Sequence, residues 1–126
     1  MEIKHVKFSK DTKIVLASLI LESSSADYRD LSLVEVVLAS AQLAQAVIYK
    51  VDDIDRSKSN TLWMRDFFIE QAVQFKVKQE QQIKLHTLSH KRINNGGAIW
   101  SVFRFTCFVG AISISFTFAH QIPSYN

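Results

Sequence analysis

The feature that most constrains this chain is a long apolar segment, LSLVEVVLASAQLAQAVIYK, at residues 31–50. Its hydrophobic residues recur with helical spacing, and a helix of this length would span about 30 Å. Asp30 or Ser32 can cap its start, and Ser32 with Glu35 has the S-x-x-E spacing of a capping box. Only Glu35 and Lys50 are charged. A helix with so little polar surface is expected to be buried on nearly every side.

The segments around this helix are predicted to be strands, because apolar residues alternate with polar ones or form short β-branched runs. An edge strand is expected first and a buried strand second, whereas residues 61–79 are ambiguous. The sequence NNGG at residues 94–97 suits a primed hairpin turn. Turn-forming and charged residues indicate a loop on either side of the helix. The expected strands are residues 2–8, 13–23, 81–93, 99–109 and 111–121, and the expected loops are residues 23–30 and 51–60.

Composition places the chain among globular proteins of one domain, with 126 residues, 48% of them hydrophobic and 21% charged. The formal net charge is +3, and the basic residues are scattered without a nucleic-acid-binding signature. This mild positive charge favours an anionic small ligand. Cys107 is the single cysteine, which excludes an internal disulfide and fits a reducing compartment. Because the opening residues are charged, no signal peptide is expected, and the expected location is the cytoplasm.

Residues 98–120 are long and apolar enough to be compared with a membrane span. Arg104 lies inside this segment, and Ser113, Ser115 and Thr117 alternate with apolar residues. A period of two is typical of a strand. We therefore expect a soluble β-hairpin here and no membrane span.

One long helix with several antiparallel strands leaves only the sheet to cover the helix. An antiparallel β-sheet wrapped around one long buried central helix, at about residues 31–50, is the hot-dog architecture. The sequence therefore predicts an α+β protein with a single hot-dog domain over residues 1–126.

The helix pattern VEVVLASAQLA, followed by MRDFFIEQAVQFK and TLSHKRI, resembles hot-dog acyl thioester proteins, most closely the FcoT-like family of long-chain acyl-CoA thioesterases. The resemblance runs from about residue 12 to the C-terminus. It implies an acyl chain beside the central helix and a pantetheine arm in a groove between two protomers. Coenzyme A or phosphopantetheine would then be part of the substrate, with no separate cofactor. The implied partners are an acyl thioester or an acyl carrier protein and a second copy of the chain.

The resemblance also implies a catalytic polar residue on or just before the helix, assisted by backbone N–H groups at the helix N-terminus. Glu35, Gln42 and Tyr49 fall on one line of the helix, about seven residues apart. Glu35 could act as a general base whose pKa is raised by burial, or it could serve only in the capping box. Ala41 occupies the position of a family Asn. The candidate catalytic residues are Glu35, Gln42, Tyr28 and Asp27, and the candidate substrate-binding residues are Lys91, Arg92, Trp63 and Trp100.

Two functions remain open at this point: a thioesterase, and a non-catalytic hot-dog module that binds an acyl ligand or only dimerises. Hydrolysis ranks above dehydration because no His lies near the helix along the chain, between His5 and His86. His86 and His90 would share one face of a strand but lie too far apart to bind one metal, so no metal site is expected. Cys107 is expected to be a buried structural thiol.

Overall fold

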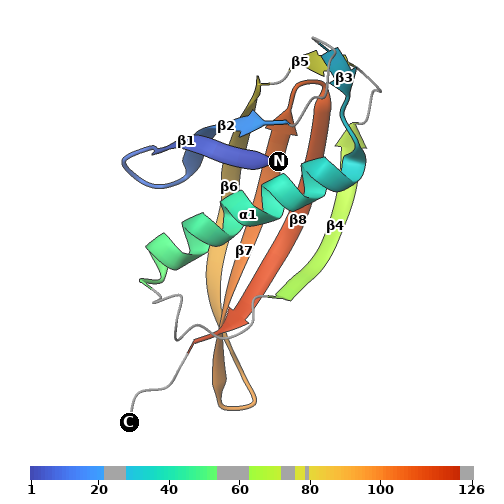
Figure 1. The fold of residues 1–126 in the computed structure, drawn as a ribbon. Helices are drawn as coiled ribbons and strands as arrows, with labels where there is room; N and C mark the ends of the chain where they lie inside the picture. The colour runs from blue at the N-terminus through green and yellow to red at the C-terminus, as the bar shows by residue number, and fades with distance from the viewer. Residues whose placement is uncertain (22–27, 54–62, 72–75, 79, 123–126) are drawn as a thin grey trace.

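The computed structural model describes residues 1–21, 28–53, 63–71, 76–78 and 80–122. Its main element is a six-stranded sheet in the order β1-β2-β6-β7-β8-β4, in which all neighbours are antiparallel. One helix, α1, crosses one face of this sheet (Figure 1). The elements are β1 (Glu2–Phe8), β2 (Ile14–Ile20), β3 (Tyr28–Asp30), α1 (Leu33–Val51), β4 (Trp63–Gln71), β5 (Lys76–Lys78), β6 (Glu80–Asn95), β7 (Ala98–Val109) and β8 (Ile112–Gln121).

Helix α1 begins as the sequence predicts. Ser32 is the N-cap: its Oγ accepts a hydrogen bond from the Glu35 N–H at 3.1 Å, and the Glu35 carboxylate accepts from the Ser32 N–H at 3.3 Å. This capping box satisfies two N–H groups that would otherwise lack partners. The helix ends at the C-cap residue Asp52, whose N–H donates to the Ile48 carbonyl.

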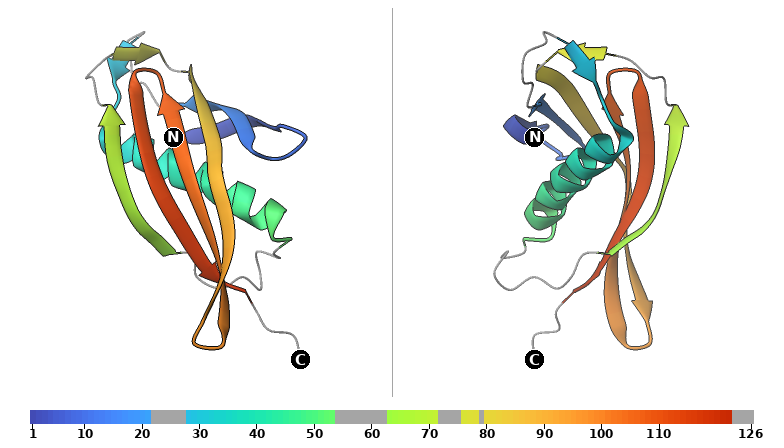
Figure 2. Two further views of the ribbon diagram at one scale, coloured as in Figure 1. Left: turned by 180° about the vertical axis from the view of Figure 1, so that it is seen from behind. Right: turned by 45° about the vertical axis from the view of Figure 1, so that its right-hand side comes forward.

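The hydrophobic core lies between α1 and the concave face of the sheet (Figure 2). The helix contributes one buried stripe, and β2, β6, β7 and β8 contribute alternate residues that point toward it. This arrangement confirms the predicted antiparallel sheet around one central helix. The largest fully buried side chains include Leu19, Leu43, Ile48, Ile83, Leu85, Phe103, Phe105, Phe116 and Ile114.

The expectation that α1 is buried on nearly every side is wrong. Val34 is 68% exposed and Leu38 is 51% exposed, and Gln42 lies on the same face, one turn further on. The sheet covers only the opposite face of the helix, as the oblique view in Figure 2 shows. A single sheet layer cannot enclose a helix completely, so an apolar face of α1 remains open.

The two C-terminal hairpins agree with the sequence. Gly96 and Gly97 connect β6 to β7, and both have positive φ angles, +64° and +83°, as a primed turn requires. Gly110, with φ +58°, lies in the turn between β7 and β8. Residues 98–120 therefore form strands, as predicted. By contrast, residues 28–30 form β3 where a loop was expected, and β3 pairs with β5.

By length and hydropathy alone, one helix in the described part of the chain, Leu33–Val51, could cross a membrane. The core helix of a globular protein passes the same test, and α1 packs against the sheet here.

Candidate functional site

A cluster of polar side chains surrounds Asp52, at the C-terminal end of α1. The Asp52 side chain is only 2% exposed, so the expectation that residues 51–60 form a surface loop is wrong at this position. Carbonyl groups give a helix C-terminus partial negative charge, which makes it an unfavourable place for a carboxylate. Burial adds a further cost unless cations or hydrogen-bond donors compensate.

Three adjacent strands supply those partners. Arg92 of β6 pairs with Ser101 of β7, and Ser101 pairs with His120 of β8, so these side chains form one row across the sheet. His120 Nε2 lies 2.6 Å from Asp52 Oδ2, and both side chains are 2% exposed. Arg92 lies at the rim, with its guanidinium 3.4 Å from Asp52 Oδ1. The sheet register thus gathers donors beneath the end of the helix.

His90 of β6 completes this cluster, which we call the Asp52 cluster: Asp52, His90, Arg92, Ser101 and His120. His90 Nε2 lies 2.8 Å from Ser101 Oγ and 3.6 Å from Asp52 Oδ1. Its ring stacks on Phe103, with centroids 4.0 Å apart and planes 9° from parallel. This stacking fixes the orientation of the imidazole.

The direction of the hydrogen bonds follows from the carboxylate. An ionised Asp52 can only accept, so the Ser101 hydroxyl, which hydrogen-bonds to it, must be the donor. Ser101 Oγ then accepts from His90 Nε2–H. A neutral His90 with its proton on Nε2 carries a lone pair on Nδ1, and the hydrogen bond to Ser101 uses Nε2 and not Nδ1. Nδ1 is therefore available as a base.

Electrostatics favour a neutral His90 beside an ionised Asp52. Desolvation lowers the pKa of His90 below its ordinary value of 6.5, and the charges of Arg92 and His120 lower it further, against the opposing effect of Asp52. For Asp52, desolvation raises the pKa, but hydrogen bonds from His120 and Ser101 and the charges of His120 and His90 outweigh it, so its pKa is below 3.8. Near neutral pH the cluster thus combines an ionised Asp52 with a neutral His90.

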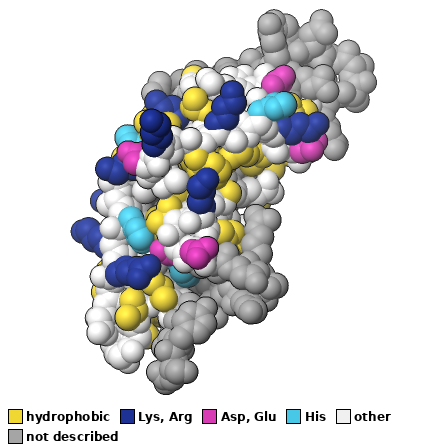
Figure 3. Space-filling view, turned by 90° about the vertical axis from the view of Figure 1, so that its left-hand side faces the viewer, with side chains coloured by type: hydrophobic (Ala, Val, Ile, Leu, Met, Phe, Trp, Pro, Cys, Tyr) yellow, Lys and Arg dark blue, Asp and Glu magenta, His cyan; other side chains and the backbone are white. Residues whose placement is uncertain are grey.

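The Asp52 cluster opens on a hollow of about 410 Å³ between the end of α1, the β1–β2 connection and β6. His90 is the cluster member that lines this hollow, and its side chain is 29% exposed. Ser101 is not among the residues that line this hollow, and its hydroxyl is held between His90 and Asp52, so it is not placed to attack an acyl group as a nucleophile. The walls are apolar at Val51, Leu88 and Phe103, and the charged residues Asp11, Lys13 and Lys91 also line it. Figure 3 shows Lys, Arg and His side chains distributed over the face of the molecule that includes the β1–β2 side.

Comparison with protein families identifies the chain. The Pseudomonas avirulence D protein (AvrD) family matches residues 5–123. The chain belongs to the AvrD family. No curated protein sequence matches it. The family is therefore not the FcoT-like one that the helix pattern suggested, and what the chain shares with acyl thioester proteins is the fold.

A solved structure supports the hot-dog fold of this AvrD-family protein. The crystal structure of yhdA from Lactococcus lactis, described as a candidate thioesterase, superposes with a TM-score of 0.61 at 13% sequence identity. The match covers 98% of this chain and 94% of yhdA. The predicted hot-dog fold class is confirmed.

Of the predicted catalytic residues of the AvrD-family chain, Glu35 lies in the first turn of α1, at the other end from the Asp52 cluster, and Gln42 lies near the middle of the helix. Glu35 is half-buried and makes the capping box, and Gln42 is exposed. The alternative structural role of Glu35 is thus present, and its catalytic role stays a prediction. Tyr28 lies in β3, although its side chain is outside the described part of the structure, as is the whole of Asp27.

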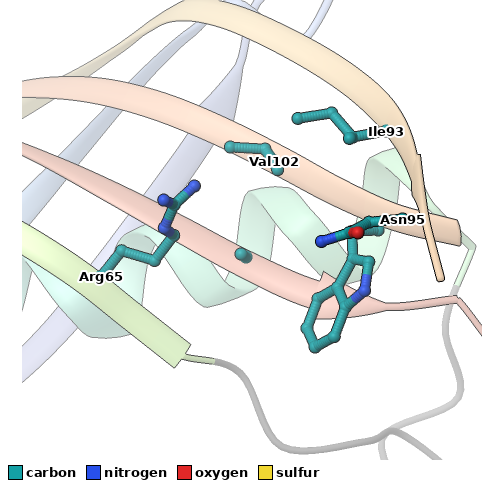
Figure 4. Close-up of a pocket in the computed structure, with 6 residues that line it drawn as sticks. Arg65, Ile93, Asn95 and Val102 are labelled. Carbon is teal, nitrogen blue, oxygen red and sulfur yellow. The ribbon is translucent and has the colours of Figure 1, made fainter. Parts of the chain in front are cut away.

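The predicted substrate-binding residues do not lie together in the structure. Lys91 lines the His90 hollow, and Arg92 contacts Asp52. Trp100 lies on the opposite, outer face of the sheet, where it lines a second hollow of about 350 Å³ with Arg65, Ile93, Asn95, Val102 and Ala119 (Figure 4). Trp63 begins β4, and its side chain is outside the described residues.

Two further expectations concern single residues. Cys107 is fully buried, and burial raises the pKa of its thiol to about 11, which fits the structural role expected for it. His86 and His90 do not share a face, because a β-bulge shifts the register of β6 against β7 between Thr87 and Ser89. Among the described residues, no group of His, Cys, Asp and Glu is arranged to hold a metal ion.

The bulge and the fold also overturn the reason for ranking hydrolysis above dehydration. His90 and His120 are remote from α1 along the chain, yet the sheet brings both to its C-terminal end. Sequence reasoning missed this cluster. The only available signal is the density of polar residues in SHKRI at residues 89–93, where the sequence suggests Lys91 and Arg92 for substrate binding but gives no role to His90.

Proposed function

We propose that this protein hydrolyses a fatty acyl thioester of coenzyme A or of an acyl carrier protein, with His90 as the general base. The observation that carries the proposal is the available Nδ1 of His90 at the wall of a hollow, backed by the buried Asp52. A base whose pKa lies below 6.5 is neutral near pH 7 and can accept a proton. The hot-dog fold, which this chain shares with a candidate thioesterase, supports the same substrate class.

In the proposed reaction, His90 Nδ1 removes a proton from a water molecule as its oxygen attacks the thioester carbonyl carbon. The tetrahedral intermediate then collapses, the carbon–sulfur bond breaks, and the thiolate takes the proton from His90 Nδ1. The transient imidazolium is stabilised through Nε2–H and Ser101 by the carboxylate of Asp52, since Asp52 remains ionised throughout. The products are a fatty acid and a free thiol.

The lining of the hollow suits such a substrate. Val51, Leu88 and Phe103 offer apolar surface to an acyl chain. Lys13 offers positive charge to the phosphates of coenzyme A or phosphopantetheine. This assignment gives Arg92 a role in positioning Asp52. Lys91 borders the hollow, but it pairs with Val102, so its side chain belongs to the outer face of the sheet.

Dehydration of a 3-hydroxyacyl thioester is a second candidate, because His90 and Asp52 lie together beside the helix. That reaction requires a base at C2 and a separate acid at the leaving hydroxyl. Asp52 is 2% exposed and cannot reach a substrate in the hollow. Hydrolysis needs only one group that first accepts and then returns a proton, so it fits the cluster better.

The test is an acyl-CoA screen across chain lengths, with release of free thiol as the readout. The His90→Gln variant should lose about 10²-fold or more in kcat, the usual effect of removing a general base. His86→Gln is the matched control, since it makes the same change on the opposite face of the same strand. Full activity of His90→Gln would refute the assignment. Binding of acyl-CoA without turnover by the wild type would instead identify a non-catalytic acyl-binding module.

A further inference from the structure

The side chain of Thr87 in β6 is anomalous. Its Oγ1 is buried and has no hydrogen-bond partner, alone among the buried side-chain N and O atoms of the described residues. A buried hydroxyl without a partner destabilises a fold, because it has lost its hydrogen bonds to water and forms none within the protein. Thr87 lines the same hollow as His90. The missing partner is therefore explained if a ligand in this hollow supplies it.

The β-bulge explains why Thr87 and His90 lie on the same side of the sheet. Thr87 pairs with Phe105 and His90 with Phe103, and both of these phenylalanines face the core. In a regular strand, residues three apart point to opposite faces. The extra residue, Leu88, reverses the alternation and is itself 50% exposed. Bulges near functional sites commonly redirect a side chain in this way.

We infer that the Thr87 hydroxyl donates a hydrogen bond to the carbonyl oxygen of the bound acyl group, on which negative charge develops when water attacks. This inference rests on the proposed function and adds a second substrate contact to it. The base and the hydrogen-bond donor would both come from one strand, separated by the bulge. No group of the described protein competes for its proton. Because Oγ1 is enclosed in this structure, the bound acyl group must displace part of the wall of the hollow to reach it.

The test uses Thr87→Val, which keeps the shape of the side chain and removes the hydroxyl. In the active protein, this change should lower kcat for octanoyl-CoA by about 10²-fold, the scale for loss of one oxyanion donor. Binding is measured by calorimetry in the His90→Gln background with two ligands, octanoyl-CoA and the thioether S-octyl-CoA, which lacks the carbonyl. Thr87→Val should weaken octanoyl-CoA binding by about threefold to tenfold and leave S-octyl-CoA binding unchanged.

Thr106→Val is the matched control on the neighbouring strand. Thr106 Oγ1 is hydrogen-bonded to Ser115 Oγ at 2.9 Å, so this change breaks an existing bond and should lower the melting temperature. Thr87→Val should leave the melting temperature unchanged or raise it, because it removes a hydroxyl without a partner.

The outcomes separate the two proposals. If Thr87→Val weakens the binding of both ligands equally, or of neither, the carbonyl contact is refuted, whatever effect His90→Gln has on turnover. If the wild type does not hydrolyse octanoyl-CoA but Thr87→Val still weakens only the carbonyl-containing ligand, the contact is supported and hydrolysis is refuted. If neither ligand binds, both proposals are refuted.

Discussion

Replacing Asp52 with Asn tests whether the Asp52 cluster holds the C-terminal end of α1 on the sheet. The substitution keeps the shape of the side chain and removes its charge. The 2.6 Å contact with His120 then becomes an ordinary hydrogen bond, which costs about 1–1.5 kcal/mol. The amide nitrogen must also occupy one of the two oxygen positions, where it faces a donor from either His120 or the Arg92 and Ser101 side. Leaving one buried donor without an acceptor costs about 1–3 kcal/mol more.

One effect opposes this loss. A neutral side chain suits the helix C-terminus better than a carboxylate does, by about 0.3–1 kcal/mol. The net expectation for Asp52→Asn is therefore a loss of about 2 kcal/mol in the free energy of unfolding. For a domain of this size, that corresponds to a decrease in melting temperature of about 8 °C. Asp52→Ala should cost about 3 kcal/mol or more, because it leaves His120 buried without a partner.

Asp53→Asn is the matched control. Asp53 is the next residue, it is exposed, and its φ of +51° is one that Asn adopts readily. This control should change stability by less than about 0.5 kcal/mol. Thermal and urea unfolding at pH 7 measure both variants. If Asp52→Asn is no less stable than Asp53→Asn, then the buried contact between Asp52 and His120 does not hold the helix end, and the electrostatic basis for His90 as a base is lost with it.

Three further predictions concern pH, the helix N-terminus and assembly. Because the pKa of His90 in the folded protein is below 6.5, kcat/KM for an acyl-CoA should rise with pH through a midpoint below 6.5; a flat profile would exclude His90. The pKa values of His90 and Asp52 are lower in the folded protein than their ordinary values. As the pH falls, the unfolded chain therefore binds protons first, and the free energy of unfolding should decrease below pH 6.5 and again below pH 3.8. Glu35→Gln should leave the melting temperature unchanged, whereas Glu35→Ala should lower the free energy of unfolding by about 1 kcal/mol, as expected for the capping box. If Glu35→Gln instead lowered the rate of hydrolysis by about 10²-fold, Glu35 would be the general base in place of His90. The exposed apolar residues Val34 and Leu38, with the edge strand β4, predict a homodimer or larger assembly at micromolar concentration, and sedimentation as a monomer would contradict this.

The fold could be predicted because its determinants are local. The helix was identified from its spacing and its Ser32–Glu35 cap, and the hairpins from the glycines at residues 96–97 and from alternating residues. The ambiguous segment at residues 61–79 contains β4, an edge strand whose exposed Phe67, Phe68 and Ile69 do not alternate with polar residues. Hydrophobicity alone could not show that one face of α1 is open. Residues that become buried only in an assembly are as apolar as residues buried within one chain.

The site could not be predicted because it depends on register. Asp52 looks like a loop residue in the sequence, and His120 lies 68 residues further along the chain. They meet only because β6, β7 and β8 place Arg92, Ser101 and His120 in one row beneath the helix end. His90 joins them only because of the bulge at Leu88, and a regular strand with the same composition would turn its imidazole toward solvent. The bulge thus decides on which face of the sheet the imidazole of His90 lies. Deletion of Leu88 would leave Thr87, Ser89 and His90 opposite Phe105, Arg104 and Phe103. The deletion should therefore remove the bulge and retain hydrolysis, and loss of hydrolysis in this variant would contradict this account of the register.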